Sequence, residues 1–410
     1  MSQKPYFHTG INYWPANKAM YWWRDFEARE VEEDFKKLAD YNFRMVRIFL
    51  TWEDFQPSPD KISQQALDYL QKTVDVAFAC GLHLMPTFFC GHMSGINWMP
   101  TWMLVPGIAR QRFPVYSDGQ IHWCRTRNCY TDLEVIAAQS LQIQKICGSL
   151  KGHPAIFSYD LGNEASNWVI PPQRSDARKW LATMTSQIKD CSGGVYITLG
   201  MHAEDLEEDR RLWPQDAACY CDFLSMHGYP FYLSWVEDPM DPSLVPFLGI
   251  VTAWLGQKPV LFQEFGLPTR SILPPSLPAD YESTCLCPLW TEVEAAIYYD
   301  KVLQCLGKEG MIGAMAWCYA DYAPSLWGKL PLNNIFHERH FGIFRHDGSA
   351  KPAAEVFLYY QNPCIRDKPG TTQVRFSWLY GKDRDKFYQH PKNNLSRLYQ
   401  RYKEWLKGGI

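Results

Sequence analysis

Short hydrophobic runs alternate with amphipathic stretches along most of the chain. In the stretch PAIFSYDLG, Phe157, Tyr159 and Leu161 occupy every second position, a spacing typical of a β-strand. In residues 26–41, by contrast, apolar residues recur every three or four positions, which indicates an amphipathic helix. Strands that alternate with helices in this way predict parallel βαβ units.

Eight strands and at least five helices follow from this pattern. The strands are predicted at residues 7–13, 45–52, 82–89, 156–161, 195–200, 222–229, 259–266 and 313–319. The helices are predicted at residues 26–41, 63–81, 131–148, 174–190 and 292–307. Eight parallel strands are the number that closes a (β/α)8 barrel, the TIM barrel. An open doubly wound sheet is the alternative, but the stretch GINYWP after the first strand is not its glycine-rich phosphate turn.

Two segments depart from the alternation. A long loop follows the third strand, and the chain after about residue 362 becomes basic and aromatic, with LSRLYQRYKEWLK as a candidate C-terminal helix. There is no internal repeat and no low-complexity linker. We therefore predict a catalytic barrel over residues 1–362 and a C-terminal helical extension over residues 363–410 that packs on the barrel.

Composition narrows the classes of partner. The net charge of −3 gives no reason to expect a nucleic-acid partner, and no apolar run of 18 or more residues predicts a membrane span. The first residues, MSQKPYFHTG, lack the apolar stretch of a signal peptide, and many of the 13 Cys lie in apolar segments. A cytoplasmic location is therefore expected, whereas the oligomeric state is left open.

No metal or other cofactor is predicted. Two C-x-C pairs, Cys219 with Cys221 and Cys285 with Cys287, lack the spacing and the further ligands that zinc sites usually show. A metal-dependent barrel hydrolase would need a His-x-His pair on the first strand, which contains only His8. Small buried side chains are the preferred interpretation of the cysteines.

Polar side chains gather where the predicted strands end, which is where the active site of a (β/α)8 barrel is built. They are Arg47 on the second strand, His92 after the third, Asn163 and Glu164 at the fourth, His227 and Tyr229 at the sixth, Glu264 at the seventh and Trp317 at the eighth. Buried carboxyls are costly unless they are paired, yet Glu164 and Glu264 would face each other across the barrel mouth. Two facing carboxyls are the requirement of glycoside hydrolysis, and a separation of roughly 5–5.5 Å gives retention of configuration.

The motifs LGNE (161–164), HGY (227–229) and QEFG (263–266), with the strand that ends in Trp317, resemble glycoside hydrolase family 5. The resemblance covers most of the predicted barrel. It implies a retaining (β/α)8 glycosidase with Glu164 as general acid/base and Glu264 as nucleophile. Supporting or substrate-binding roles are implied for Arg47 beside the nucleophile, His92 after the third strand, Asn163 at the sugar 2-hydroxyl, His227 and Tyr229 near the nucleophile, and Trp317 as a platform under the sugar.

The substrate is predicted from the same resemblance. NYWPANKAMYWW near the N-terminus and the loop GHMSG look like the β-mannosidase and β-mannanase branches of the family. Trp98 and Trp102 on the long loop are predicted to form a stacking wall of the cleft, with burial under the loop as the alternative. β-Mannosides or short β-1,4-manno-oligosaccharides are thus the predicted substrates. A β-glucosidase or endo-β-1,4-glucanase is one alternative, and a non-catalytic carbohydrate-binding barrel is another.

Overall fold

The computed structural model describes residues 7–270, 287–360, 377–379 and 381–408, and a closed barrel of eight parallel strands lies at its centre. The barrel strands are β1 (His8–Asn12), β2 (Met45–Thr51), β3 (His83–Cys90), β8 (Ser158–Asn163), β9 (Tyr196–His202), β10 (Leu224–His227), β11 (Val260–Phe265) and β12 (Gly313–Ala316). Their order around the barrel is β1-β12-β11-β10-β9-β8-β3-β2. The predicted (β/α)8 fold is confirmed, and each of the eight predicted strands occurs.

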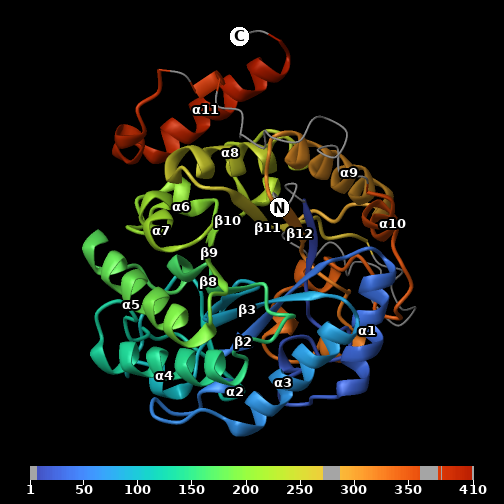
Figure 1. The fold of residues 1–410 in the computed structure, drawn as a ribbon. Helices are drawn as coiled ribbons and strands as arrows, with labels where there is room; N and C mark the ends of the chain where they lie inside the picture. The colour runs from blue at the N-terminus through green and yellow to red at the C-terminus, as the bar shows by residue number, and fades with distance from the viewer. Residues whose placement is uncertain (1–6, 271–286, 361–376, 380, 409–410) are drawn as a thin grey trace.

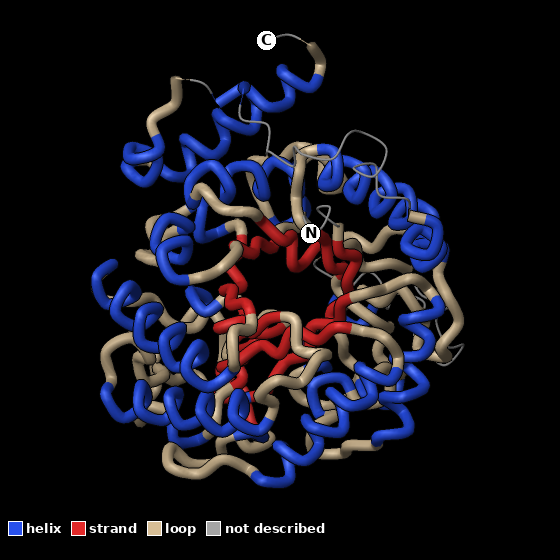
Figure 2. The backbone as a smooth tube through the Cα atoms, viewed as in Figure 1, coloured by secondary structure: helices blue, strands red, loops and turns tan. Residues whose placement is uncertain are grey.

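Helices surround the strands, as Figures 1 and 2 show. They are α1 (Ala28–Asp40), α2 (Trp52–Phe55), α3 (Gln64–Ala79), α4 (Leu133–Ser149), α5 (Arg174–Ser192), α6 (Glu204–Glu207), α7 (Pro214–Tyr220), α8 (Leu244–Gly256), α9 (Glu292–Lys308), α10 (Pro352–Tyr359) and α11 (Pro391–Leu406). Local signals explain several helix starts. Ser63 accepts a hydrogen bond from the amide of Ala66 at the start of α3, and Thr291 forms a capping box with Glu294 at the start of α9.

Side chains inside the barrel form an apolar layer beneath a polar one. Successive strand residues point to opposite faces, so residues two apart on a strand share a face. An apolar cluster includes four residues that each lie two positions before a polar or site residue: Met45 before Arg47, Met85 before Thr87, Leu261 before Gln263 and Met315 before Trp317. The apolar layer therefore fills the barrel, and the polar residues follow toward the carboxyl ends of the strands.

The long loop after β3 contains a small sheet that the sequence did not predict. Its strands are β4 (His92–Met93), β5 (Ile96–Trp98), β6 (Val115–Ser117) and β7 (Gln120–His122), in the order β4-β5-β6-β7. Strands of two or three residues are too short to show a period of two along the sequence. Strand β4 and the turn after it line one side of the barrel mouth, and His92 of β4 is paired with Asn97 of β5.

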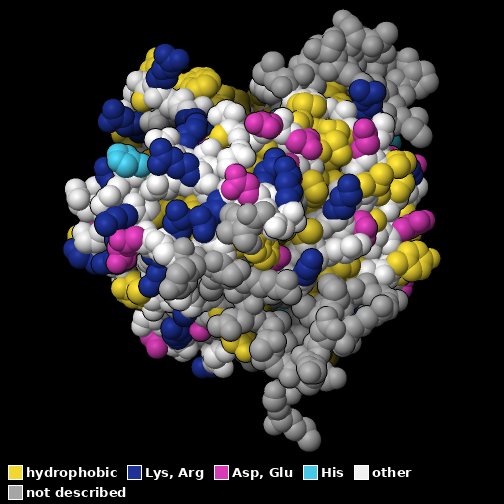
Figure 3. Space-filling model, turned by 90° about the horizontal axis from the view of Figure 1, so that it is seen from above, with side chains coloured by type: hydrophobic (Ala, Val, Ile, Leu, Met, Phe, Trp, Pro, Cys, Tyr) yellow, Lys and Arg dark blue, Asp and Glu magenta, His cyan; other side chains and the backbone are white. Residues whose placement is uncertain are grey.

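The C-terminal helix α11 packs against α8, as Figure 1 shows. The rings of Tyr399 and Phe247 lie 4.9 Å apart, and the hydroxyl of Tyr399 is 3.1 Å from Oγ of Ser243. The predicted boundary between residues 362 and 363 lies outside the described residues. Of the described helices, none is long and apolar enough to cross a membrane. On the face shown in Figure 3, basic, acidic and hydrophobic side chains are interspersed.

Candidate active site

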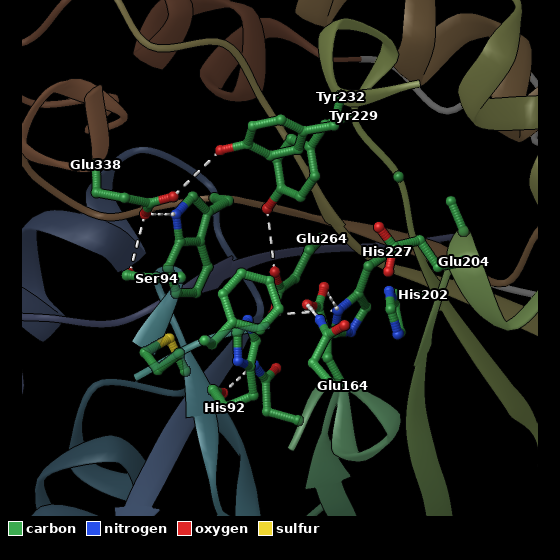
Figure 4. A pocket seen from close by; sticks show the side chains of 18 of the residues that line it. His92, Ser94, Glu164, His202, Glu204, His227, Tyr229, Tyr232, Glu264 and Glu338 are labelled. Carbon is green, nitrogen blue, oxygen red and sulfur yellow. Dashed lines mark hydrogen bonds and ion pairs between the residues drawn. The ribbon is translucent and has the colours of Figure 1, made fainter. Parts of the chain in front are cut away.

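A cavity of about 330 Å³ opens at the carboxyl ends of the barrel strands, and Figure 4 shows the side chains that line it. Seven of the ten predicted site residues line this cavity: His92, Asn163, Glu164, His227, Tyr229, Glu264 and Trp317. Arg47 does not line the cavity but contacts the residues that do. Trp98 and Trp102 are not among the lining residues.

The fully buried Arg47 organises the floor of the cavity. Its Nη1 donates to Oε1 of Glu264 at 2.5 Å, and its Nη2 donates to Oδ1 of Asn163 at 2.8 Å. Nε and Nη2 also donate to Oδ2 of Asp160, at 3.1 and 2.7 Å. A buried guanidinium needs such partners because an unpaired buried charge is costly. Arg47 thus supplies a charged donor to Glu264 and fixes the side-chain oxygen of Asn163.

Glu164 and Glu264 approach each other across the mouth. Oε1 of Glu164 lies 3.0 Å from Nδ1 of His227, and Oε1 of Glu264 lies 3.5 Å from the same nitrogen. Ligand atoms of the three side chains all lie within 4.8 Å of one another. Carboxyls about 5–5.5 Å apart are typical of retaining glycosidases, whereas inverting enzymes need roughly 6.5–9.5 Å to admit a water. The spacing fits a direct attack on the sugar.

The hydrogen bonds of His227 show that it shares one proton with the carboxyls. Nε2 of Gln263 donates to Asp160, so Oε1 of Gln263 must accept the N–H of His227 Nε2 at 3.1 Å. Nδ1 of His227 therefore either carries a second proton or accepts one from a carboxyl. The proton can lie on His227 or on Glu164 along their 3.0 Å contact.

Burial and charge act in opposite directions on this group. Burial acts to raise the pKa of Glu164, but the imidazoles of His202 and His227 outweigh it and hold that pKa below its usual value. The pKa of Glu264 is raised by burial, against the opposing effects of His227 and Arg47. Burial acts to lower the pKa of His227, but the carboxylates of Glu264 and Glu164 raise it. In the structure the shared proton is thus favoured on His227.

The backbone and one amide aim Glu164 into the cavity. Glu164 directly follows β8 and has a left-handed backbone with φ 47°, a conformation uncommon for residues other than glycine and frequent at functional sites. Its N–H donates to the carbonyl of Gly200 on β9. Nδ2 of Asn167 donates to Oε2 at 3.0 Å, and Arg210 fixes that amide by donating to its oxygen at 2.9 Å.

The remaining predicted residues surround the two glutamates. The hydroxyl of Tyr229 donates to Oε2 of Glu264 at 3.0 Å. Nδ2 of Asn163 donates to the backbone carbonyl of His92 at 2.8 Å, so as far as the described residues go its second N–H is left for another acceptor. Burial lowers the pKa of His92 to about 4, and its Nδ1 lies 2.8 Å from Oδ1 of Asn97. His92 is therefore a neutral wall of the cavity at physiological pH.

The predicted stacking wall of Trp98 and Trp102 is not formed. Trp98 is buried, packs on Tyr116 at 4.6 Å between ring centroids, and donates to the carbonyl of Met93. Trp102 is partly buried and donates to the carbonyl of Gln56. The physical reason is local packing: Trp98 lies within β5 of the small sheet, and the Trp102 ring packs on Trp52 at 5.5 Å between centroids. Burial under the loop, the alternative interpretation, describes both residues.

Two groups of cavity residues were not predicted. At one end lie Ser94, Tyr232 and Glu338, with His337 bound to Tyr232, and at the other lie His202 and Glu204, with Arg112 paired to Glu204. Asn167 lines the cavity beside Glu164. Of these, only His202 ends a barrel strand. His202 was detectable as a polar residue at the end of the fifth strand, whereas the others come from loops or short helices that carry no strand-end signal.

The three central ligand atoms could also be considered for a metal ion. Glu164, His227 and Glu264 are the one such cluster found within the described ranges. Arg47, however, already places a positive charge at Oε1 of Glu264, and Tyr229 donates to Oε2. A cation here would face that guanidinium at close range, so the donor set fits a divalent metal poorly.

No protein-family model and no curated protein matches the chain. Among solved structures, a GH5_18 enzyme from Streptomyces cattleya in complex with GlcNAc is similar, with a TM-score of 0.70 and 21% identity over 89% of this chain and 80% of that one. A glutamate-to-alanine variant of GH5_18 from the same organism, in complex with Manb1-4GlcNAc, has a TM-score of 0.70 and 21% identity, over 87% of this chain and 82% of its own.

A third similar structure is the exo-beta-1,4-mannosidase Op5Man5 from Opitutaceae bacterium strain TAV5. Its TM-score is 0.67 and its identity 26%, and the match covers 86% of this chain and 58% of that one. At sequence identities this low, the similarity is evidence for a shared fold. These neighbours confirm the (β/α)8 barrel that the sequence predicts, and the GH5_18 enzymes among them carry the name of the family that the strand-end motifs resemble.

Proposed function

We propose that this protein is a retaining β-glycoside hydrolase that acts by double displacement on β-mannosides or short β-1,4-manno-oligosaccharides. The observation that carries the proposal is the approach of Glu164 and Glu264, whose ligand atoms lie within 4.8 Å of each other at the mouth of a (β/α)8 barrel. That spacing leaves no room for a water between a carboxylate and the anomeric carbon.

Each glutamate has the surroundings that its role requires. Glu264 receives hydrogen bonds from Arg47 and Tyr229, which stabilise a carboxylate that attacks the anomeric carbon. Glu164 must begin the reaction protonated, and Nδ1 of His227 lies 3.0 Å from its Oε1. A bound sugar excludes water, and a drier cavity favours the neutral Glu164–His227 pair over the ion pair. Glu164 then protonates the leaving oxygen and later activates the water.

The substrate proposal rests on the neighbours and on the size of the cavity. Similar structures include GH5_18 enzymes with Manb1-4GlcNAc and an exo-beta-1,4-mannosidase. A volume of about 330 Å³ is near the lower end of ligand pockets, about 300–1,000 Å³, and favours a chain end or a disaccharide over a polymer. Hydrolysis of a β-glucoside in preference to a β-mannoside would support the alternative glucosidase.

Two further parts of the proposal concern the whole chain. A cytoplasmic location is supported by ten of the described cysteines, which are free thiols. The extension over residues 363–410 is proposed to stabilise the barrel, since the rings of Trp235 and Tyr399 lie 5.4 Å apart and Phe247 packs beside them. Short oligosaccharides that enter the cell would be suitable substrates for such an enzyme.

The proposal is tested with aryl β-mannoside and aryl β-glucoside, with the first product followed by NMR. Retention of the anomeric configuration is expected, and inversion would rule out a covalent glycosyl-enzyme intermediate. With added azide, Glu164→Ala should give a β-glycosyl azide, because azide replaces the water that needs a base. Glu264→Ala should give an α-azide, because azide enters from the face that the carboxylate vacates. The opposite stereochemistry in either variant would reverse the two roles, and no turnover by the wild type would favour the binding-protein alternative.

A further inference from the structure

A third carboxyl lies on the wall of the cavity. Glu338 is 7% exposed and belongs to the short helix His337–His340, about twenty residues along the chain after the end of β12. In Figure 4, Glu338 and Ser94 lie on one side of Glu264, whereas His202 and Glu204 lie on the other side, beyond Glu164. Because Glu164 is the proposed proton donor to the leaving group, Glu338 lies toward the opposite end of the bound sugar.

The two oxygens of this carboxyl are unequally satisfied. Oε2 accepts from Oγ of Ser94 at 3.0 Å and from Nε1 of Trp317 at 3.2 Å. For Oε1, the structure shows within its described part only the hydroxyl of Tyr232 at 3.5 Å and Nε2 of His337 at 3.7 Å. The Tyr232 hydroxyl lies much closer to His337 Nε2, at 2.6 Å. Oε1 therefore retains room for a strong donor.

Within the described ranges, no Lys or Arg side chain forms an ion pair with Glu338. Burial lowers the pKa of His337 to about 4, so this imidazole is neutral near pH 7. Burial also raises the pKa of Glu338 itself, to about 7. A buried carboxyl without a cation is costly and is seldom kept for stability alone. A carboxylate that opens onto a cavity is, however, a strong acceptor for hydroxyl groups.

We propose that Glu338 is a specificity-determining residue that accepts hydrogen bonds from free hydroxyls on the end of the sugar ring remote from the bond that is cleaved. Trp317 ties the carboxyl to the predicted platform under the ring, since its Nε1 donates to Oε2. The hydroxyls at that end are those on C3, C4 and C6. Because a β-1,4 chain continues through O4, a carboxylate here selects terminal sugars. The inference rests on the proposed function and adds the residue that recognises the chain end.

The test compares 4-nitrophenyl β-mannoside with its 3-deoxy, 4-deoxy and 6-deoxy analogues. Hydrogen bonds to charged groups correspond to roughly a 10- to 100-fold change in kcat/KM, so the wild type should lose that much on at least one analogue. In Glu338→Ala, kcat/KM for the same analogue should be only a few-fold below kcat/KM for the parent substrate. Glu338→Gln, which keeps the shape, should give an intermediate ratio. Circular dichroism checks that both variants fold.

Glu204→Gln is the matched control, because it also changes a cavity carboxyl, at the end near Glu164. It should keep the wild-type ratio between parent and deoxy substrates, even if its turnover changes. The inference would be overturned if the ratio of kcat/KM between parent and deoxy substrate were the same in the wild type and in Glu338→Ala for all three analogues. If the wild type cleaves no aryl glycoside, the proposed function fails. The same comparison is then made by calorimetric binding of mannose and the deoxy sugars, which decides the role of Glu338 separately.

Discussion

Replacing Glu338 with glutamine should stabilise the protein at pH 8 and have much less effect at pH 5. Burial raises the pKa of this carboxyl from 4.5 to about 7. A carboxyl with a raised pKa in the folded state disfavours folding once it is ionised, so the wild type loses stability as pH rises from 4.5 through about 7. Glutamine is similar in shape and never ionises. Its oxygen can take the position of Oε2 and still accept from both Trp317 and Ser94.

The size of the effect follows from the shift. Each pKa unit corresponds to about 1.4 kcal/mol, so ionised Glu338 costs the folded state about 3 kcal/mol at pH 8 and under about 1 kcal/mol at pH 5. Unfolding entropy of about 2.1 cal/mol/K per residue gives about 0.9 kcal/mol/K for 410 residues. The difference between the two pH values, about 2.5 kcal/mol, is thus equivalent to about 3 °C in Tm.

Differential scanning calorimetry of wild type and Glu338→Gln, from pH 5 to pH 8, measures this directly. The variant's advantage in Tm should grow with pH over that range. Glu404→Gln removes an exposed carboxyl on α11 and controls for the loss of one charge. A Tm difference that stays constant with pH, or that falls as pH rises, would refute the argument that burial destabilises the ionised carboxyl.

Three further predictions concern the barrel, the loop and metals. Gly200→Ala should lower both Tm and activity, because a Cβ there would lie 2.6 Å from the carbonyl oxygen of Gly162 and 3.0 Å from Nη2 of Arg47. Gly162→Ala is the control: its Cβ would have no contact under 3.8 Å, so this variant should behave like wild type in thermal melts and activity assays. Trp98→Ala should lower the free energy of unfolding, measured in urea, by about 3–5 kcal/mol and leave the KM of the folded protein unchanged. A rise in KM without a loss of stability would instead support Trp98 as part of a stacking wall. Treatment with EDTA should leave the rate of aryl glycoside hydrolysis unchanged, and a loss that added metal restores would contradict the predicted absence of a metal.

The eight barrel strands were predictable because each buries an apolar run bounded by polar residues or turns. The helices that were predicted have one polar face, as in α1, whose buried residues Val31, Phe35 and Leu38 recur at helical spacing. Helix α8 was missed because it has no such face. Twelve of its residues are buried, with the barrel on one side and α11 on the other. Its sequence, LVPFLGIVTAWLG, therefore shows no helical period that could distinguish it from a strand.

The same distinction explains which site residues were predictable. The carboxyl ends of parallel strands converge in any closed barrel, so Glu164 and Glu264 had to meet once their strands were assigned. The position of Glu338 depends instead on the path of the chain after β12. Arg339 holds that path by donating twice to the carbonyl of Leu332, and Trp327 donates to the carbonyl of Tyr322.

Those contacts join residues within one irregular segment, and no periodicity of the sequence encodes them. The two glutamates with proposed catalytic roles therefore lie at the ends of barrel strands, where strand geometry fixes them, whereas Glu338, with its proposed role in chain-end selection, lies on a loop. A loop can change without altering the Arg47–Glu264 contact beneath it. On this view, exchange of the segment that carries Glu338 would change which sugar is accepted while both glutamates keep their roles.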